Sequence, residues 1–273
     1  MARMEFDQIA RNGMVLLGCG KMGSAMLEGW LARGIPPESV HVIDPAPSDW
    51  LRDTGVKLNA DLPQSPAVAI VAVKPQMMGD ALPLLQAFGN SKTLFISIAA
   101  GTSLARFSEA LGTATPIIRA MPNTPAAVGC GITALIGNAR ASEGDMALAE
   151  TLLAAVGTTV RLDDESLMDA VTALSGSGPA YVFHMIEAMA LAGQAEGLAP
   201  DLAMKLARAT VIGAGQLAAG SDETAEQLRI NVTSPKGTTA AALDVLMHSD
   251  TGLPPLMARA IAAAAARSRE LAK

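Results

Sequence analysis

Short apolar runs alternate with amphipathic segments along the first part of the chain. The runs cover residues 14–17, 40–43, 67–73 and 93–98, and residues 115–119 are a fifth candidate strand. Continuous apolar runs of this length are typical of strands buried on both faces of a parallel sheet. Helical periodicity follows several of them, so the pattern predicts an α/β fold with a doubly wound, Rossmann-like parallel sheet. A run at residues 158–162 is the last predicted strand.

The pattern changes to helices alone after residue 163. Helices are predicted over residues 164–174, 179–196, 201–219, 223–229, 239–247 and 252–271. We therefore predict a first domain at residues 1–163 and an all-helical domain at residues 164–273. Residues 180–195 and 262–266 are apolar around most of the helix, and such a helix has to be buried. A domain of this size cannot enclose them alone, which predicts at least a homodimer.

Composition and charge narrow the functional classes. The formal net charge of −6 offers no basic cluster for nucleic acid, so a small-molecule ligand is expected. The apolar runs are too short to span a bilayer, and the charged start lacks a signal-peptide core, which predicts a cytoplasmic protein without membrane contact. Cys19, Cys130 and three scattered histidines lack metal-ligand spacing, so we expect no metal.

The first apolar run leads directly into Gly18-Cys19-Gly20-Lys21-Met22-Gly23, and a helical segment follows at residues 24–33. This is the strand, G-x-G-x-x-G turn and helix of a dinucleotide-binding fold. Gly18 permits the tight turn, Gly20 lets the backbone approach a pyrophosphate, and Gly23 brings the helix against the strand. We expect NADPH or NADH here.

The second apolar run ends in Asp44, 21 residues beyond Gly23. A carboxylate there can accept hydrogen bonds from both hydroxyls of an adenosine ribose. The alternative is a turn residue preceding Pro45. The carboxyl ends of the later predicted strands carry further clusters of small or polar residues. Ligands of doubly wound sheets bind at these ends. Among them, Lys74 is more often a solvated strand-end residue than a catalytic one.

Two motifs stand out in the helical part. At residues 231–239, Pro235 and Gly237 break the backbone before a helix, which gathers the hydroxyls and free amides of Thr238 and Thr239 at its start. Such a start suits a small carboxylate, although an ordinary capped helix is the alternative. Residues 174–181 combine two glycines with Pro179, which favours either tight helix packing or a part in a substrate pocket.

Six ordered motifs together give the chain a family resemblance. They are residues 18–23, 72–76, 97–101, 119–125, 174–181 and 231–239. With these motifs the chain resembles the Δ1-pyrroline-5-carboxylate reductases, which reduce a cyclic imine to proline in the last step of proline biosynthesis. The resemblance implies a helical dimerisation domain, often assembled further into a ring of five dimers.

The resemblance also implies site residues. Cofactor contacts would fall on Gly18, Cys19, Gly20, Lys21, Met22, Gly23, Asn59, Ala72, Val73, Lys74, Pro75, Ala99 and Asn123, beside the Asp44 proposed above. Substrate contacts would fall on Ser234, Gly237, Thr238 and Thr239, with the Thr239 hydroxyl near the imine nitrogen.

Two positions differ from expectation for that family. Lys236 stands where the family usually has glycine. If the loop needs positive φ at this position, lysine is strained there and the loop is reshaped. Asp44 would repel the 2′-phosphate of NADPH, a cofactor the family commonly accepts.

Reduction of a cyclic imine fits both the residues that are present on the long helix and the absence of a lysine there. Carbonyl reduction needs a general acid, and related dehydrogenases place a lysine on the long helix, which here offers Tyr181, Phe183, His184 and Glu187 but no lysine. A cyclic imine arrives protonated and needs positioning instead. The alternatives are a 3-hydroxyacid-type dehydrogenase and a noncatalytic dinucleotide-binding protein.

Overall fold

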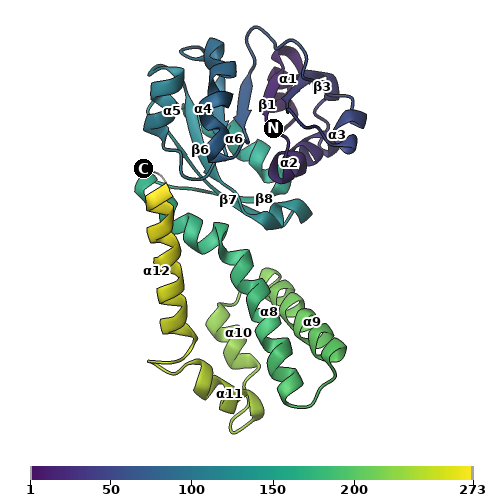
Figure 1. Ribbon diagram of the computed structural model, residues 1–273, viewed down its shortest axis with the longest axis vertical. Coiled ribbons are helices and arrows are strands. Elements are labelled where there is room, and N and C mark those ends of the chain that lie inside the picture. Colours follow the sequence, from purple (N-terminus) through teal and green to yellow (C-terminus); the bar gives the residue numbers. More distant parts are fainter. Residues whose placement is uncertain (1, 272–273) are drawn as a thin grey trace. The chain divides into compact units, whose positions relative to one another are not determined.

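A computed structural model describes residues 2–271 of the chain (Figure 1). The described chain divides into two compact units. One is the chain up to Gly176 together with the end of the chain from Ala265, and the other is Ser177–Ala264.

An eight-stranded sheet forms the centre of the first unit. Its strands are β1 (Met14–Leu17), β2 (Val40–Ile43), β3 (Lys57–Leu58), β4 (Val68–Val71), β5 (Leu94–Ser97), β6 (Ile117–Met121), β7 (Gly131–Gly137) and β8 (Gly157–Arg161). The spatial order is β3-β2-β1-β4-β5-β6-β7-β8, and the strands from β3 to β6 are parallel. Leu17 pairs with both Ile43 and Val71, so the carboxyl ends of β1, β2 and β4 meet at one edge of the sheet.

The β7 edge corrects one expectation. The predicted sheet was wholly parallel, whereas β7 is antiparallel to β6, and β8 is parallel to β7. Only residues 122–130 separate β6 from β7, and this connection is too short for the crossover that a parallel neighbour requires. The fold is therefore confirmed as a mostly parallel α/β sheet, with its last two strands reversed.

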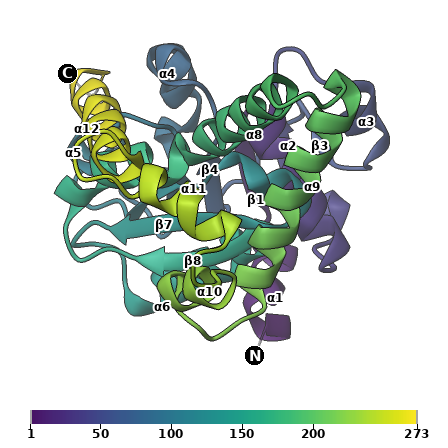
Figure 2. The same cartoon turned by 90° about the horizontal axis from the view of Figure 1, so that it is seen from below.

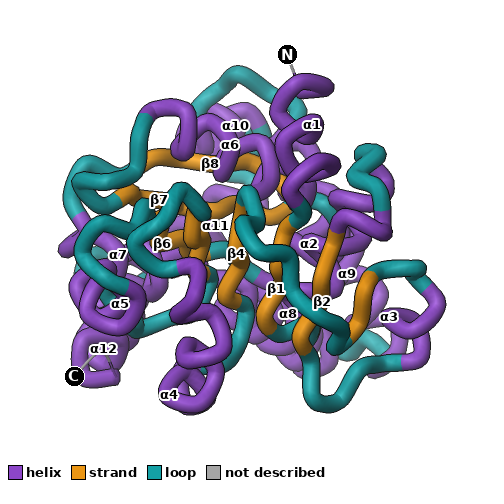
Figure 3. The backbone as a smooth tube through the Cα atoms, turned by 90° about the horizontal axis from the view of Figure 1, so that it is seen from above, coloured by secondary structure: helices purple, strands orange, loops and turns teal. Residues whose placement is uncertain are grey.

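Helices cover both faces of the sheet (Figure 3). The α-helices of this unit are α1 (Ala2–Asn12), α2 (Lys21–Ala32), α3 (Asp49–Asp53), α4 (Met78–Ala81), α5 (Leu104–Leu111), α6 (Glu143–Leu153) and α7 (Met168–Val171). Met14 and Leu16 of β1 belong to one buried cluster with α2 and α6, while Val15 and Leu17 belong to another with α4 and α5. This alternation along one strand is the sign of a sheet buried on both faces.

The second unit consists of helices, as predicted (Figure 2). They are α8 (Gly178–Ala195), α9 (Pro200–Ala219), α10 (Ala225–Asn231), α11 (Thr238–Leu246) and the larger part of α12 (Leu253–Leu271). Helices α8 and α9 pack on each other. Large apolar side chains nevertheless remain exposed, including Phe183 at 61% and Leu191 at 67%.

Candidate active site

The glycine-rich loop, residues 18–23, connects β1 to α2, and each of its glycines has a different environment. Gly18 has φ +88°, and a Cβ atom there would lie 2.9 Å from the carbonyl oxygen of Ala72. A Cβ atom on Gly23 would lie 2.5 Å from the carbonyl oxygen of Gly18. Gly20 has nothing within 4 Å of such an atom. Gly18 and Gly23 are therefore required for packing, while Gly20 leaves room for a ligand against the backbone.

Gly20 is also the N-cap of α2, and no side chain caps this helix start. The first backbone amides of a helix have no partner inside the helix, and the helix dipole adds positive potential there. Open space above Gly20 and unpaired amides beside it form a cradle of the kind that binds a pyrophosphate. The residues present thus fit a dinucleotide.

Asp44 follows β2, and its carboxylate points at the glycine-rich loop. One oxygen accepts a hydrogen bond from the amide of Cys19 at 2.7 Å, and the other accepts one from the amide of Ala46 at 2.8 Å. Asn59 holds the Asp44 backbone on both sides, donating to its carbonyl at 2.8 Å and accepting from its amide at 2.9 Å. Asn59 takes φ +49° to do so. Asp44 therefore ties the end of β2 to the loop.

Cys19 is buried beside this carboxylate. Burial, with a smaller contribution from the negative charge of Asp44, raises the pKa of its thiol to about 11. A thiol with that pKa stays protonated at neutral pH and is a poor nucleophile. Cys19 thus contributes its backbone amide and its packing to the loop.

A pocket of about 290 Å³ opens next to the loop. Its lining comprises Gly20, Lys21, Met22, Ala72, Val73, Lys74, Pro75, Ile98, Ala99, Ala100, Met121 and Pro122. Eight of these are residues that the sequence assigned to the cofactor, from Gly20 to Ala99. Gly18, Cys19, Gly23, Asp44, Asn59 and Asn123 are not in the lining.

Met121 and Pro122 line the pocket, although neither is among the predicted site residues. They follow β6, so the rule that ligands bind at the carboxyl ends of strands was the signal available for them. Their neighbour Asn123 uses its side chain within the protein, accepting from the Ile132 amide at 3.0 Å and donating to the Ser175 hydroxyl at 3.3 Å.

The second candidate region, the 234–239 loop, lies in the helical unit. Pro235 is followed by Lys236 with φ +59°, and the Gly237 amide donates to the Ser234 carbonyl at 3.1 Å. A proline followed by a residue with positive φ is typical of a type II turn. A Cβ atom on Gly237 would lie 2.3 Å from the Ser234 hydroxyl and 3.1 Å from the Ser234 carbonyl oxygen, so the turn packs closely at this glycine.

This turn opens directly into α11. Gly237 is the N-cap, no side chain caps the helix, and Thr238 and Thr239 are its first two residues. Thr239 is half-buried and Thr238 is exposed. The alternative in which Thr239 caps the helix is therefore not supported, since glycine holds the cap position. The start of α11 presents unpaired amides together with a threonine hydroxyl, an arrangement that suits a small carboxylate.

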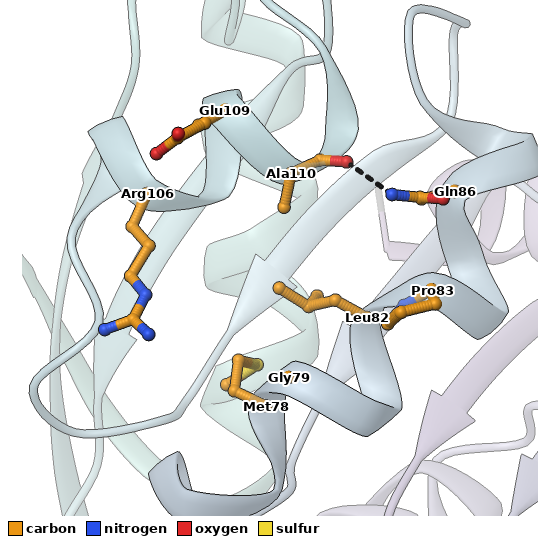
Figure 4. A pocket seen from close by; sticks show the side chains of 8 residues that line it. All are labelled: Met78, Gly79, Leu82, Pro83, Gln86, Arg106, Glu109 and Ala110. Carbon is orange, nitrogen blue, oxygen red and sulfur yellow. Dashed lines mark hydrogen bonds between the residues drawn. The ribbon is translucent and has the colours of Figure 1, made fainter.

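A larger hollow of about 330 Å³ lies elsewhere on the first unit (Figure 4). It is bounded by α4, the 3₁₀ helix Leu82–Phe88 and α5, where Gln86 donates to the Ala110 carbonyl at 3.3 Å. None of the predicted site residues lines it.

The described residues 2–271 contain no group of three His, Cys, Asp or Glu side chains placed to hold a metal ion. No helix among them is long and apolar enough to cross a membrane.

Comparison with known proteins relates both regions to families. Residues 165–271 match the family described as pyrroline-5-carboxylate reductase dimerisation, and residues 14–101 match the family described as NADP oxidoreductase, coenzyme F420-dependent. The sheet is thus part of an NADP-binding domain and the helices form a dimerisation domain.

Full-length relatives agree with these matches. The chain is 38% identical to pyrroline-5-carboxylate reductase of Pseudomonas aeruginosa over 95% of its own length and 97% of the relative. A solved pyrroline-5-carboxylate reductase of Coxiella burnetii is 34% identical, covers 96% of this chain and 99% of its own, and superposes with a TM-score of 0.89. The NADP-bound pyrroline carboxylate reductase of Plasmodium falciparum is 28% identical, covers 96% and 98%, and gives a TM-score of 0.79. With such identity over nearly the whole chain, the protein belongs to the pyrroline-5-carboxylate reductase family.

Proposed function

We propose that this reductase binds its cofactor at the glycine-rich loop and its substrate at the 234–239 loop. The reaction is reduction of the cyclic imine 1-pyrroline-5-carboxylate to L-proline. The observation that carries the assignment of the substrate loop is the start of α11, whose glycine N-cap leaves the first amides unpaired.

The substrate carries one carboxylate and one imine nitrogen, and the loop offers a partner for each. The amides at the start of α11 bind the carboxylate, with the helix dipole adding to the attraction. Lys236, three residues before Thr239, adds a positive charge to the same loop. These groups hold the substrate by its unreactive end.

The Thr239 hydroxyl orients the imine nitrogen. The nitrogen of a cyclic imine is basic and arrives protonated, so the hydroxyl oxygen accepts its hydrogen bond and fixes the ring for attack at the adjacent carbon. Reduction of a protonated imine yields the amine directly and needs no general acid. Helix α8, which carries no lysine, is in keeping with this reaction and not with a 3-hydroxyacid dehydrogenase.

The cofactor, NADPH or NADH, supplies the hydride. The amides at the start of α2 and the open space over Gly20 suit its pyrophosphate. Ala72, Val73, Lys74, Pro75 and Ala99 form the pocket wall at the ends of β4 and β5. Asp44 lies where the adenosine ribose of a dinucleotide is usually held, and its charge favours NADH over NADPH.

The dimerisation domain makes the protein a homodimer, and we propose a ring of five dimers as the complete assembly. Exposed apolar residues on α8 and α9, such as Phe183 and Leu217 at 57%, support an extensive interface in this domain. We place the functional boundary between residues 163 and 164, since the dimerisation match begins at residue 165. Light scattering tests the assembly, and a stable, active monomer would contradict it.

We propose a cytoplasmic location, where reduced nicotinamide cofactor is available. Cys19 and Cys130 are both free thiols, in keeping with a reducing compartment.

A direct assay tests the proposed reaction. The purified protein is mixed with NADH or NADPH and either pyrroline-5-carboxylate or a 3-hydroxyacid with the oxidised cofactor. We expect proline to form from pyrroline-5-carboxylate and the reduced cofactor, and no turnover of the 3-hydroxyacid. Turnover of the hydroxyacid alone would favour the dehydrogenase, and cofactor binding without any turnover would favour a noncatalytic protein.

A further inference from the structure

The segment that follows the sheet, residues 165–176, contacts one wall of the cofactor pocket repeatedly. We name this segment the brace. The wall is formed by residues 119–123, of which Met121 and Pro122 line the pocket. Each contact below lies within the first compact unit.

The first contact is an ion pair with a buried arginine. Glu165 accepts a hydrogen bond from Arg119 at 2.7 Å, and the Arg119 side chain is only 8% exposed. The same carboxylate oxygen accepts the amide of Leu104, the first residue of α5, at 2.9 Å. Glu165 therefore joins β6 to the start of α5, and Ala99 and Ala100, which precede α5, also line the pocket.

The second and third contacts come from the other end of the brace. The Asn123 amide donates to the hydroxyl and carbonyl oxygens of Ser175 at 3.3 and 3.4 Å. A Cβ atom on Gly176 would lie 2.7 Å from the terminal methyl of Met121. A side chain at position 176 would therefore displace the flexible end of Met121, which lines the pocket.

The brace is itself held firmly. Its last five residues, Thr172–Gly176, form a π-helical turn, an irregularity often found at functional sites. Met168 and Ala173 are buried, and Asp169 accepts a 2.6 Å hydrogen bond from Ser268 near the end of α12. A fixed brace can therefore hold the wall in one position.

We propose that the brace positions the cofactor: Glu165, Ser175 and Gly176 set the shape of the 119–123 wall and thereby the affinity for the nicotinamide nucleotide. These are positioning residues, since they act through Arg119, Asn123 and Met121. The proposal rests on the assignment of this pocket to the cofactor. It gives Ser175 and Gly176, at the start of the 174–181 motif, a role in cofactor binding beyond helix packing.

A glycine pair two residues apart provides the test. Gly176→Ala places a methyl against Met121, whereas Gly178→Ala meets nothing within 4 Å. The dissociation constants of NADH and NADPH are measured by fluorescence titration, alongside the KM for the imine and the thermal midpoint of the apo protein. We expect Gly176→Ala to weaken binding of the preferred cofactor by about tenfold, which corresponds to roughly 1.4 kcal/mol. The Gly178→Ala control should stay within about twofold, well below that threshold.

A double variant separates an effect through Met121 from a general loss of structure. Met121→Val removes the terminal methyl that Gly176→Ala would strike, so adding Gly176→Ala to Met121→Val should not weaken cofactor binding further. Unchanged affinity in the Gly176→Ala protein would overturn the proposal. So would an equal loss in both backgrounds, or a loss matched by a lowered thermal midpoint.

The proposed cofactor site has its own control. Gly20→Ala fills the open space over the loop, and it should weaken cofactor binding whatever the brace does. If Gly20→Ala weakens binding and Gly176→Ala does not, only the brace proposal fails. If Gly20→Ala leaves binding unchanged, the pocket assignment fails with it.

Discussion

The two proposed ligand sites use the same device, an uncapped helix start that follows a glycine turn, but they are supported very differently. In the glycine-rich loop, Gly18 and Gly23 are closely packed against backbone atoms, and Asp44 and Asn59 hold the loop from behind. In the 234–239 loop, a single turn between Ser234 and Gly237 holds an exposed segment. The glycine-rich loop is thus preformed by the core of its domain, whereas the 234–239 loop depends on its own few residues.

The largest effect is expected at Thr239, because few other residues support the loop that carries it. Thr239→Ala removes the hydroxyl and keeps the amides at the start of α11. We expect turnover to fall by a factor on the order of ten to a thousand, with a small change in the KM for the imine, because one oriented hydrogen bond is lost at the reacting centre.

Two matched variants control for this change. Thr239→Ser should recover much of the turnover, and Thr238→Ala, on the exposed neighbour, should change it far less. Normal turnover in a destabilised Thr239→Ala protein would show that Thr239 has a structural role only.

The second prediction tests how rigidly the glycine-rich loop is held. Gly23→Ala forces a methyl against the Gly18 carbonyl, so we expect the free energy of unfolding to fall by about 1–3 kcal/mol, together with the loss of cofactor binding. Gly20→Ala should weaken cofactor binding while thermal stability stays unchanged. Thermal denaturation and cofactor titration of both variants check this, and equal stability losses would remove the distinction between the two glycines.

The third prediction concerns Asp44, whose carboxylate already accepts two backbone amides. We expect the wild-type enzyme to use NADH better than NADPH, because a second negative charge at the ribose is repelled. Asp44→Ser should shift the ratio of kcat/KM values toward NADPH by about tenfold, or 1.4 kcal/mol. A wild-type enzyme that strongly prefers NADPH would show that the carboxylate serves the loop alone.

The smallest effect is expected at Lys236, where the turn requires positive φ from a residue that disfavours it. Lys236→Gly should relieve strain of about 1 kcal/mol, partly offset by the greater freedom of glycine in the unfolded chain. Loss of the charge should raise the KM for the imine only about twofold to fivefold, because an exposed charge interacts weakly with a ligand. Lys236→Asn, which tolerates positive φ without a charge, separates the two effects. A KM that is unchanged in both variants would exclude a role in substrate attraction.

Regular, doubly buried elements were predictable from the sequence. Strands such as β1 and β4 have continuous apolar runs because both faces of the sheet are covered. The glycines of the glycine-rich loop have a fixed spacing because the turn from strand to helix has a fixed geometry. The helices of the second unit were predictable because glycine and proline separate them.

Features that depend on distant residues were not predictable. Strand β7 is bounded by Gly131 and Gly137 and exposes Ile132, so its run did not stand out, and its reversed direction follows from the length of a connection. The helix α1 was also missed, since it meets a core formed later in the chain through Ile9 and, in part, Phe6. The Asn123–Ser175 contact and the Glu165–Arg119 pair join residues 52 and 46 positions apart, and no local pattern encodes them.

Hydrogen exchange of the two loops tests the central claim most directly. The dimer is incubated with NADH, with L-proline, or with pyrrolidine, which lacks the carboxylate, and amide protection is followed by mass spectrometry. NADH should protect peptides covering residues 18–24, and proline but not pyrrolidine should protect peptides covering residues 234–241. If saturating proline leaves residues 234–241 unprotected, or if pyrrolidine protects them equally, the start of α11 does not bind the substrate carboxylate.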